Sequence, residues 1–351
     1  MTNVLLTVSG VIDPDIKRQV AQQMRPKADY LEMAQCFDAE LMDYTSARER
    51  AGWFGNLLER VGGPNFLLAW TCFRERSRYS VIFTDGEQIG LPLAWLLKFG
   101  GRKGIAHLMI VHILSVGKKM MLLDVFGLKK YIDTFFVYST WQKRFIEERW
   151  QVQSEQVVFT PFMVDSDFFS PAQVKPQQRR MICAVGLEFR DYPTLIEAVR
   201  DLDVEVVIAA ASPWSKREDS TEYVEIPENV TVQKFSQFEL RQLYADSLFV
   251  VMPLYEVNFQ AGVTALLEAM AMERAIICSR TSGQTDVVVA GETGLYVPPE
   301  DPYALREAIV RLLASPELAE KMGRAGRCRI EEEMSLERYV ERLNQFVRGL
   351  K

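Results

Sequence analysis

Short apolar runs alternate with longer amphipathic stretches along the whole chain, and this rhythm constrains the fold more than any other feature. Strands of a parallel sheet are buried on both faces, so they read as continuous apolar runs, and helical crossovers must join them. The alternation therefore predicts an α/β protein with doubly wound parallel sheets. The expected strands are Val4–Val8, Val81–Thr84, Ala106–His112, Thr134–Tyr138, Val157–Thr160, Met181–Val185, Val204–Ala210, Val230–Lys234, Leu248–Met252, Ala275–Cys278 and Gly294–Val297.

The chain has 351 residues, which corresponds to two domains of ordinary size. Residues Asp165–Arg180 contain two prolines and three glutamines and follow neither helical nor strand spacing, which indicates a boundary region. We therefore expect an N-terminal Rossmann-like domain over residues 1–168 and a C-terminal one over residues 169–332. A last helical segment, 333–351, can pack back on the first domain. In such sheets ligands bind at the carboxyl ends of the strands.

Charge and cysteine content exclude several functions. The 41 lysine and arginine residues are outnumbered by 47 aspartate and glutamate residues, so no overall basicity favours nucleic acid. Five scattered cysteines without a CxxC pair, and two histidines, give no standard metal site, and we expect neither a metal nor a cofactor. The N-terminus lacks a basic segment, and the apolar stretches are shorter than the roughly 20 residues of a membrane span. We therefore expect a cytoplasmic protein.

The segment Val250–Pro299 carries the clearest chemical signal. A buried strand is followed by a glycine-containing loop, Tyr255–Gly262, and by a strong helix that begins at Val263. The free amides and the positive dipole end of such a helix suit a diphosphate, and Thr264 adds a hydroxyl in the first turn. Glu268 lies about 7.5 Å further along the helix, roughly the span from a diphosphate to a ribose diol. The alternative for Glu268 is a solvated helix residue.

Several motifs of the second half occur in the serial order of a known family. They are Ala184–Gly186, Leu195–Ala198, Leu267–Ala271, Ser282–Asp286 and Gly291–Pro298. Together they resemble the retaining nucleotide-sugar glycosyltransferases of family four, which have the GT-B fold of two Rossmann-like domains facing across a cleft. The resemblance implies a hexosyltransferase-type enzyme. It would move a sugar from a nucleotide-diphosphate sugar to a hydroxyl acceptor (a sugar, a lipid or a small metabolite), with retention at the anomeric carbon.

The resemblance also assigns roles in binding the donor. Glu268 corresponds to the family's ribose-binding glutamate, and the amides of Val263 and Thr264, after Gly262, correspond to its phosphate-binding amides. Each of these assignments agrees with the anion site expected at the start of the helix.

Two further residues correspond to groups that face the donor sugar in the family, and we expect catalytic roles for both. Gln260 stands where the family has a glutamate, so it keeps hydrogen-bonding capacity but lacks the charge. Glu256 is a second choice for that contact. His112 ends an apolar run of the first half, where the family often has a histidine; the alternative is a core histidine.

A basic group of the family faces the leaving diphosphate. The family has an arginine just after the Val-Gly strand end and a lysine a few residues later. Here no base directly follows Gly186, and Arg190 takes the place of the lysine. Arg190 can chelate a phosphate with two hydrogen bonds and stabilise the leaving group without a metal. The alternative is a surface ion pair of Arg190 with Asp191 or Glu188.

The acceptor side is less informative. Ser9 and Gly10 follow the first strand, and Asp85 and Glu87 follow the second expected strand. These residues can bind acceptor hydroxyls, or the two carboxylates can cap the next helix.

Residues Lys98–Lys130 carry seven basic side chains and one acid among apolar ones. This stretch can make peripheral contact with an anionic membrane, or it is an ordinary amphipathic surface. Two other functions stay open beside the transferase. One is a non-catalytic GT-B-like nucleotide-sugar-binding protein, which Gln260 and the missing first base favour, and the other is a nucleotide-sugar epimerase.

Overall fold

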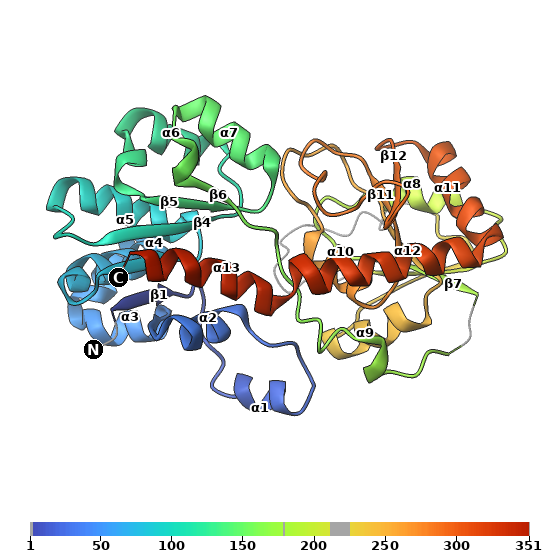
Figure 1. Ribbon diagram of the computed structural model, residues 1–351, viewed down its shortest axis with the longest axis horizontal. Coiled ribbons are helices and arrows are strands. Elements are labelled where there is room, and N and C mark those ends of the chain that lie inside the picture. The colour runs from blue at the N-terminus through green and yellow to red at the C-terminus, as the bar shows by residue number, and fades with distance from the viewer. Residues whose placement is uncertain (1–2, 178–179, 211–224, 351) are drawn as a thin grey trace. The chain divides into compact units, whose positions relative to one another are not determined.

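The computed structural model describes residues 3–177, 180–210 and 225–350. The chain divides into two compact units, each with its own sheet (Figure 1). The main division falls between residues 160 and 161, eight residues before the boundary expected at residue 168, because Phe168 and Phe169 pack in the core of unit 2. Unit 1 comprises Met1–Arg18, Lys27–Thr160 and Val340–Lys351, and unit 2 comprises Gln19–Pro26 and Pro161–Tyr339.

Within the described residues, unit 1 has a sheet of six parallel strands. They are β1 (Val4–Thr7), β2 (Ala39–Met42), β3 (Val81–Thr84), β4 (Ala106–Val111), β5 (Thr134–Val137) and β6 (Val157–Phe159). The order is β2-β1-β3-β4-β5-β6, so the direction of winding reverses between β1 and β3. The helices are α2 (Asp29–Phe37), α3 (Tyr44–Ala51), α4 (Trp53–Glu75), α5 (Glu87–Gly100), α6 (Gly117–Phe126) and α7 (Thr140–Trp150).

Helices cover both faces of this sheet, whose central strands are mostly apolar. β1 and β3 are buried along their whole length. One face packs on α3, α4 and α5. On the other face the rings of Phe37, Phe83, Phe136 and Phe346 form a row with centroids 5.4–5.9 Å apart. Phe346 belongs to α13 (Leu336–Gly349), whose residues from Val340 onward are part of unit 1.

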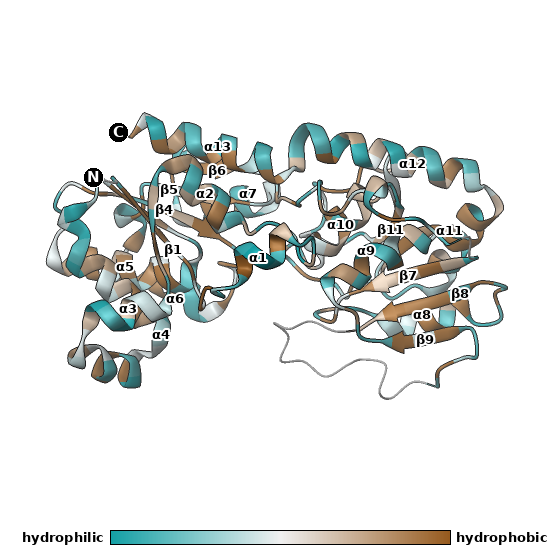
Figure 2. Ribbon diagram, turned by 90° about the horizontal axis from the view of Figure 1, so that it is seen from below, coloured by the Kyte–Doolittle hydropathy of each residue, from teal (hydrophilic) through white to brown (hydrophobic). Residues whose placement is uncertain are grey.

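Unit 2 repeats this architecture in the part of the chain that the structure describes. Its strands are β7 (Met181–Val185), β8 (Glu205–Ala209), β9 (Val230–Gln233), β10 (Phe249–Met252), β11 (Ala275–Ser279) and β12 (Gly294–Val297). All pair in parallel in the order β12-β11-β10-β7-β8-β9, and winding reverses between β7 and β10. β7 and β8 are hydrophobic in Figure 2. The helices are α8 (Tyr192–Val199), α9 (Gln237–Asp246), α10 (Val263–Ala271), α11 (Pro302–Ala314) and α12 (Pro316–Arg329), and α1 (Ile16–Ala21) crosses the division between the units.

The predicted fold class is confirmed, since both sheets are parallel and covered by helices. Each expected strand is present with its ends within one residue of the prediction. The sequence pattern does not predict β2, because this strand is short, half-exposed and interrupted by Glu40. No helix in the described ranges combines the length and the apolar character that crossing a bilayer requires.

Candidate functional site

The loops that follow β7 and β10 form the centre of the candidate site in unit 2. These two strands pair in parallel through Cys183 and Val250, and winding reverses between them. Connections leave such a switch point in opposite directions, which opens space for a ligand at the carboxyl edge. The loop after β7 carries Gly186 and Arg190, and the loop after β10 leads through Gly262 into α10. The topology therefore brings these three predicted residues together.

Arg190 is buried against both loops. Its Nε donates to Val185 O at 2.9 Å, and its Nη1 donates to Glu188 O at 2.7 Å. A Cβ built on Gly262 would lie 2.9 Å from Nη2 of Arg190, and a Cβ on Gly186 would overlap the same atom. Both glycines have positive φ, which side-chain-bearing residues rarely adopt. Burial lowers the pKa of Arg190, yet a guanidinium stays charged in proteins, so the loops enclose a positive charge.

The start of α10 adds amides to this charge. Gly262 is the N-cap, with φ 77°, and α10 begins at Val263. A hydrogen bond of 3.1 Å from Leu266 N to Gly262 O closes the first turn, so the amides of Val263 and Thr264 precede it. Thr264 is exposed. An arginine beside the amides of a helix start is an arrangement that binds anions.

Glu268 lies deeper on α10 and is 5% exposed, which excludes the solvated alternative. Tyr244 of α9 donates from Oη to its Oε2 at 2.8 Å. Burial raises the pKa of Glu268 to about 7, and the hydrogen bond from Tyr244 opposes that rise. Tyr244 therefore holds one of the two carboxylate oxygens of Glu268.

Gln260 and Gln284 place side-chain oxygens in the same region. Gln284 follows β11, is fully buried, and donates from Nε2 to Ala261 O at 2.8 Å. Among the described residues, the side-chain oxygens of both glutamines are buried without a hydrogen-bond partner. Buried amide oxygens are normally paired, so these two oxygens have unused acceptor capacity.

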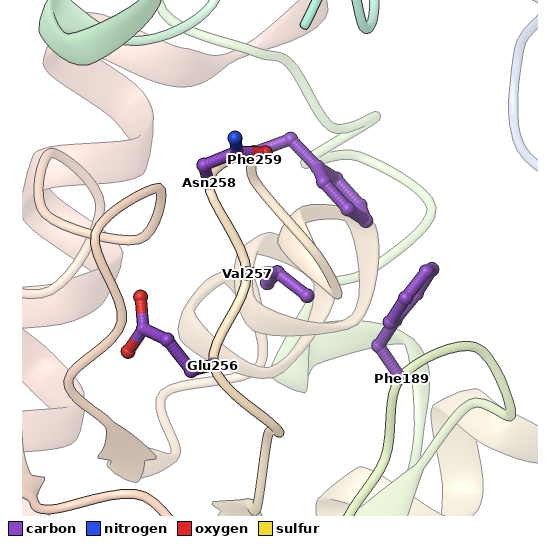
Figure 3. Close-up of a pocket in the computed structure, with 5 residues that line it drawn as sticks. All are labelled: Phe189, Glu256, Val257, Asn258 and Phe259. Atoms are coloured by element: carbon purple, nitrogen blue, oxygen red, sulfur yellow. The ribbon is translucent and has the colours of Figure 1, made fainter. Parts of the chain in front are cut away.

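A pocket of about 410 Å³ opens between the loop after β7 and the loop after β10. In Figure 3 the rings of Phe189 and Phe259 extend toward the same space, while the carboxylate of Glu256 turns away from them. The two ring centroids are 5.0 Å apart, at 79°. Glu256 instead accepts from Ser282 N at 2.9 Å. The lining residues are Phe189, Glu256, Val257, Asn258 and Phe259.

In unit 1, the residues predicted for the acceptor meet at the other switch point, between β1 and β3. Thr7 Oγ1 donates to Asp85 Oδ1, and Ser9 N donates to Asp85 Oδ2, both at 2.6 Å. His112 is exposed, and its Nε2 donates to the backbone oxygen of Asp85 at 2.9 Å. Asp85 therefore joins the loops after β1 and β3. It does not cap α5, whose N-cap is Gly86.

Glu87 is buried and holds the loop that follows β4. Its carboxylate accepts from His112 N at 2.8 Å, from Ile113 N at 3.1 Å and from Lys119 Nζ at 2.6 Å. Burial alone would raise the pKa of Glu87, but His112 and Lys119 hold it below its ordinary value. Its contacts are those of a positioning group. Gly10 has open space beside it, since a Cβ there would meet no atom within 4 Å.

The basic stretch of residues 98–130 is partly neutralised inside unit 1. Lys98 and Lys129 bind backbone oxygens, and Arg102 and Lys119 pair with carboxylates. Four of its large apolar side chains are exposed. Contact with a membrane stays a prediction. The exposed side chains are Phe99, Val116, Met121 and Val125.

Sequence reasoning missed two residues of the site in unit 2. Tyr244 lies in the segment Leu240–Tyr244, which belongs to the motifs of the family resemblance, but no contact with Glu268, 24 residues away on another helix, was expected from it. Phe189 reads as an ordinary loop residue, and its φ of 58° follows from the fold around it. The sequence did offer one indication for Tyr244. It lies on an apolar side of α9, and a buried tyrosine hydroxyl needs a hydrogen-bond partner.

Comparisons with known proteins find similarity in the second half of the chain. Residues 165–329 match the family model described as glycosyl transferases group 1. The human alpha-1,3/1,6-mannosyltransferase ALG2 is 36% identical over 84 residues, which are 24% of this chain and 20% of ALG2. Alignments with the curated relatives span between 20% and 49% of those proteins' lengths.

Two solved structures resemble the whole chain. Sucrose-phosphate synthase from Thermosynechococcus elongatus has a TM-score of 0.72 at 17% identity, covering 99% of this chain and 98% of that one. HepE from Anabaena, in complex with UDP, has a TM-score of 0.73 at 13% identity, covering 99% of this chain and 100% of that one. At such low identity the structural likeness shows the fold alone, which is GT-B. Residues 165–329 carry the similarity of this chain to the group 1 glycosyl transferases.

Proposed function

We propose that this protein is a glycosyltransferase that moves a sugar from a nucleotide-diphosphate sugar to a hydroxyl acceptor, with retention of the anomeric configuration. The observation that carries the proposal is the meeting of Arg190 with Gly186, Gly262 and the first amides of α10 at the switch point of unit 2. The family match supports glycosyl transfer. The complex of HepE with UDP supports a nucleotide diphosphate as the leaving group.

Each group at this switch point has a role in the proposed reaction. The diphosphate would lie on the amides of Val263 and Thr264 beside Arg190, and the ribose diol would bind Glu268. Gln260 would contact a hydroxyl of the sugar. As the bond from the anomeric carbon to the phosphate oxygen breaks, negative charge grows on the diphosphate. The guanidinium and the helix dipole then stabilise the transition state more than the bound donor.

Replacing Arg190 tests the proposal. Arg190→Ala is expected to reduce kcat by about 10²–10³-fold, the usual loss when one charge-stabilising group is removed. Arg190→Lys keeps the charge but loses the two-pronged geometry, so an intermediate loss is expected. Release of nucleoside diphosphate from UDP-, GDP- and ADP-sugars measures turnover, with and without EDTA, and circular dichroism controls for folding.

The same assay distinguishes the alternatives. NMR of the first-formed anomer, with water or an added sugar as acceptor, reports retention. Undiminished turnover by a folded Arg190→Ala variant would remove Arg190 from the mechanism. Binding of nucleotide sugars without turnover would instead indicate a non-catalytic binding protein.

A further inference from the structure

Phe189 is a bulky side chain on a strained backbone. Its φ is 58°, in the left-handed region. An aromatic residue there is an outlier that persists only when the surrounding structure enforces it, and such strain is concentrated at functional sites.

The neighbours of Phe189 hold this conformation. Arg190 forms an isolated antiparallel bridge with Leu254 and donates from Nη1 to Glu188 O at 2.7 Å. Tyr255 N donates to Phe189 O at 3.2 Å. The residues on both sides are therefore fixed by the loops that enclose Arg190, and the ring of Phe189 lines the pocket.

The pocket that receives this ring is apolar and uncharged on the side of the two rings. Phe189, Phe259 and Val257 line it, and the carboxylate of Glu256 is held elsewhere by Ser282 N (Figure 3). Asn258 supplies the neutral polar group. A volume of about 410 Å³ is in the range of sites for small ligands.

We propose that Phe189 and Phe259 form the subsite for the glycosyl group of the donor and select a 6-deoxyhexose over a hexose, and both over a hexuronic acid. This inference rests on the proposed function. Both rings belong to the loops that meet at Arg190 and Gly262, where the diphosphate would bind, and the glycosyl group is bonded directly to that diphosphate.

The preference follows from desolvation. Aromatic rings pack well on the C–H surfaces of a sugar. A hydroxyl packed against the ring faces loses its water, and the rings offer it no hydrogen-bond acceptor of comparable strength. A carboxylate in the same place loses far more. The three sugars differ only at C6, which carries a methyl group, a hydroxymethyl group or a carboxylate. The cost of desolvating that group therefore sets the expected order of preference.

The test first finds the nucleotide and then varies the sugar alone. Melting temperatures with UDP, GDP, ADP and dTDP identify the base that binds. Donors on that base that differ at C6 are then compared by kcat/KM, for example UDP-glucose, UDP-quinovose and UDP-glucuronate, or GDP-mannose, GDP-D-rhamnose and GDP-mannuronate. The 6-deoxy donor is expected to be favoured by about tenfold or more, and the hexuronate is expected not to turn over.

Phe189→Gly separates the ring from the backbone. Glycine adopts a φ of 58° without strain, so the variant is expected to stay folded and to bind the free nucleoside diphosphate as the wild type does. Its preference for the 6-deoxy donor is expected to fall to near one. Phe189→Leu keeps apolar bulk and should retain part of the preference.

The outcomes distinguish this inference from the proposed function. A wild type that prefers the hexose or the hexuronate, or a Phe189→Gly variant with unchanged selectivity, would overturn the subsite while leaving glycosyl transfer intact. If no nucleotide raises the melting temperature and no donor turns over, the proposed function itself fails.

Discussion

At the scale of the residue, Tyr244 controls the charge of Glu268. Its hydrogen bond to Oε2 favours the carboxylate, whose pKa burial raises to about 7. Tyr244→Phe removes that bond, so the pKa of Glu268 is expected to rise further. A ribose diol binds best to the ionised form. Nucleoside diphosphate affinity should therefore fall several-fold near neutral pH and recover in alkaline buffer. Calorimetric titration of both proteins across this range checks the prediction, and parallel pH profiles would contradict it.

The sequence indicates some of these residues and not others, for a physical reason. Arg190 and Glu268 stand at fixed distances from motifs along the chain, so their positions can be read without a structure. The partners of the Glu87 carboxylate cannot be predicted from the sequence in this way. Its carboxylate could cap a helix or bind a ligand, and the choice is made by amides 25 and 26 residues away that the fold brings to it.

At the scale of the element, α10 depends on the glycine at its N-cap, Gly262. Gly262→Ala imposes strain at φ 77° and places a methyl group 2.9 Å from both Arg190 Nη2 and Met252 Sδ. Gly291→Ala is the matched control, since Gly291 has a φ of 79° and open space around it. Both variants should lose about 1 kcal/mol of unfolding free energy to backbone strain. Gly262→Ala should lose more, and it alone should weaken nucleoside diphosphate binding. Urea unfolding and ligand-induced melting shifts measure this, and equal losses in both assays would refute it.

The elements themselves were predictable where burial is uniform. Strands buried on both faces leave a continuous apolar run, and each expected strand is found. β2 and α4 are the counter-examples. β2 is half-exposed, so its pattern lacks the run. α4 is interrupted by a kink at Gly63, which has a φ of 75° and is followed by Pro64, a pair of residue types that is typical of turns.

At the scale of the whole molecule, the division of the chain follows packing more than composition. Residues 165–180 have the composition of a linker, yet Phe168 and Phe169 lie in the core of unit 2. In the sequence, two adjacent aromatic residues inside a polar segment do not show which domain core they pack into. In the structure the pair packs beside Tyr244 of unit 2, and the ring centroids of Phe169 and Tyr244 are 6.2 Å apart. This contact assigns the pair to unit 2.

Two buried titratable groups should give the units opposite responses to pH. Burial lowers the pKa of His107 in unit 1 to about 4 and raises that of Glu268 in unit 2 to about 7. The unfolded state binds the extra proton at His107, so unit 1 loses stability as pH falls from about 6.5 toward 4. The folded state binds it at Glu268, so unit 2 loses stability as pH rises from about 4.5 toward 7. Each effect is about 3 kcal/mol at full size, on the scale of 1.4 kcal/mol per pKa unit.

Tryptophan fluorescence can follow unit 1 in this experiment, because five of the six tryptophans lie there, at positions 53, 70, 95, 141 and 150, and the sixth, Trp214, lies outside the described residues. In urea, the fluorescence transition should move to lower denaturant between pH 7.5 and pH 5. Circular dichroism reports both units. Glu268→Gln should therefore stabilise the transition seen by circular dichroism clearly at pH 7.5 and much less at pH 5. It should not move the fluorescence transition at either pH. Because the two groups lie in different units, a fluorescence transition that responds to Glu268→Gln would mean that the units unfold as one.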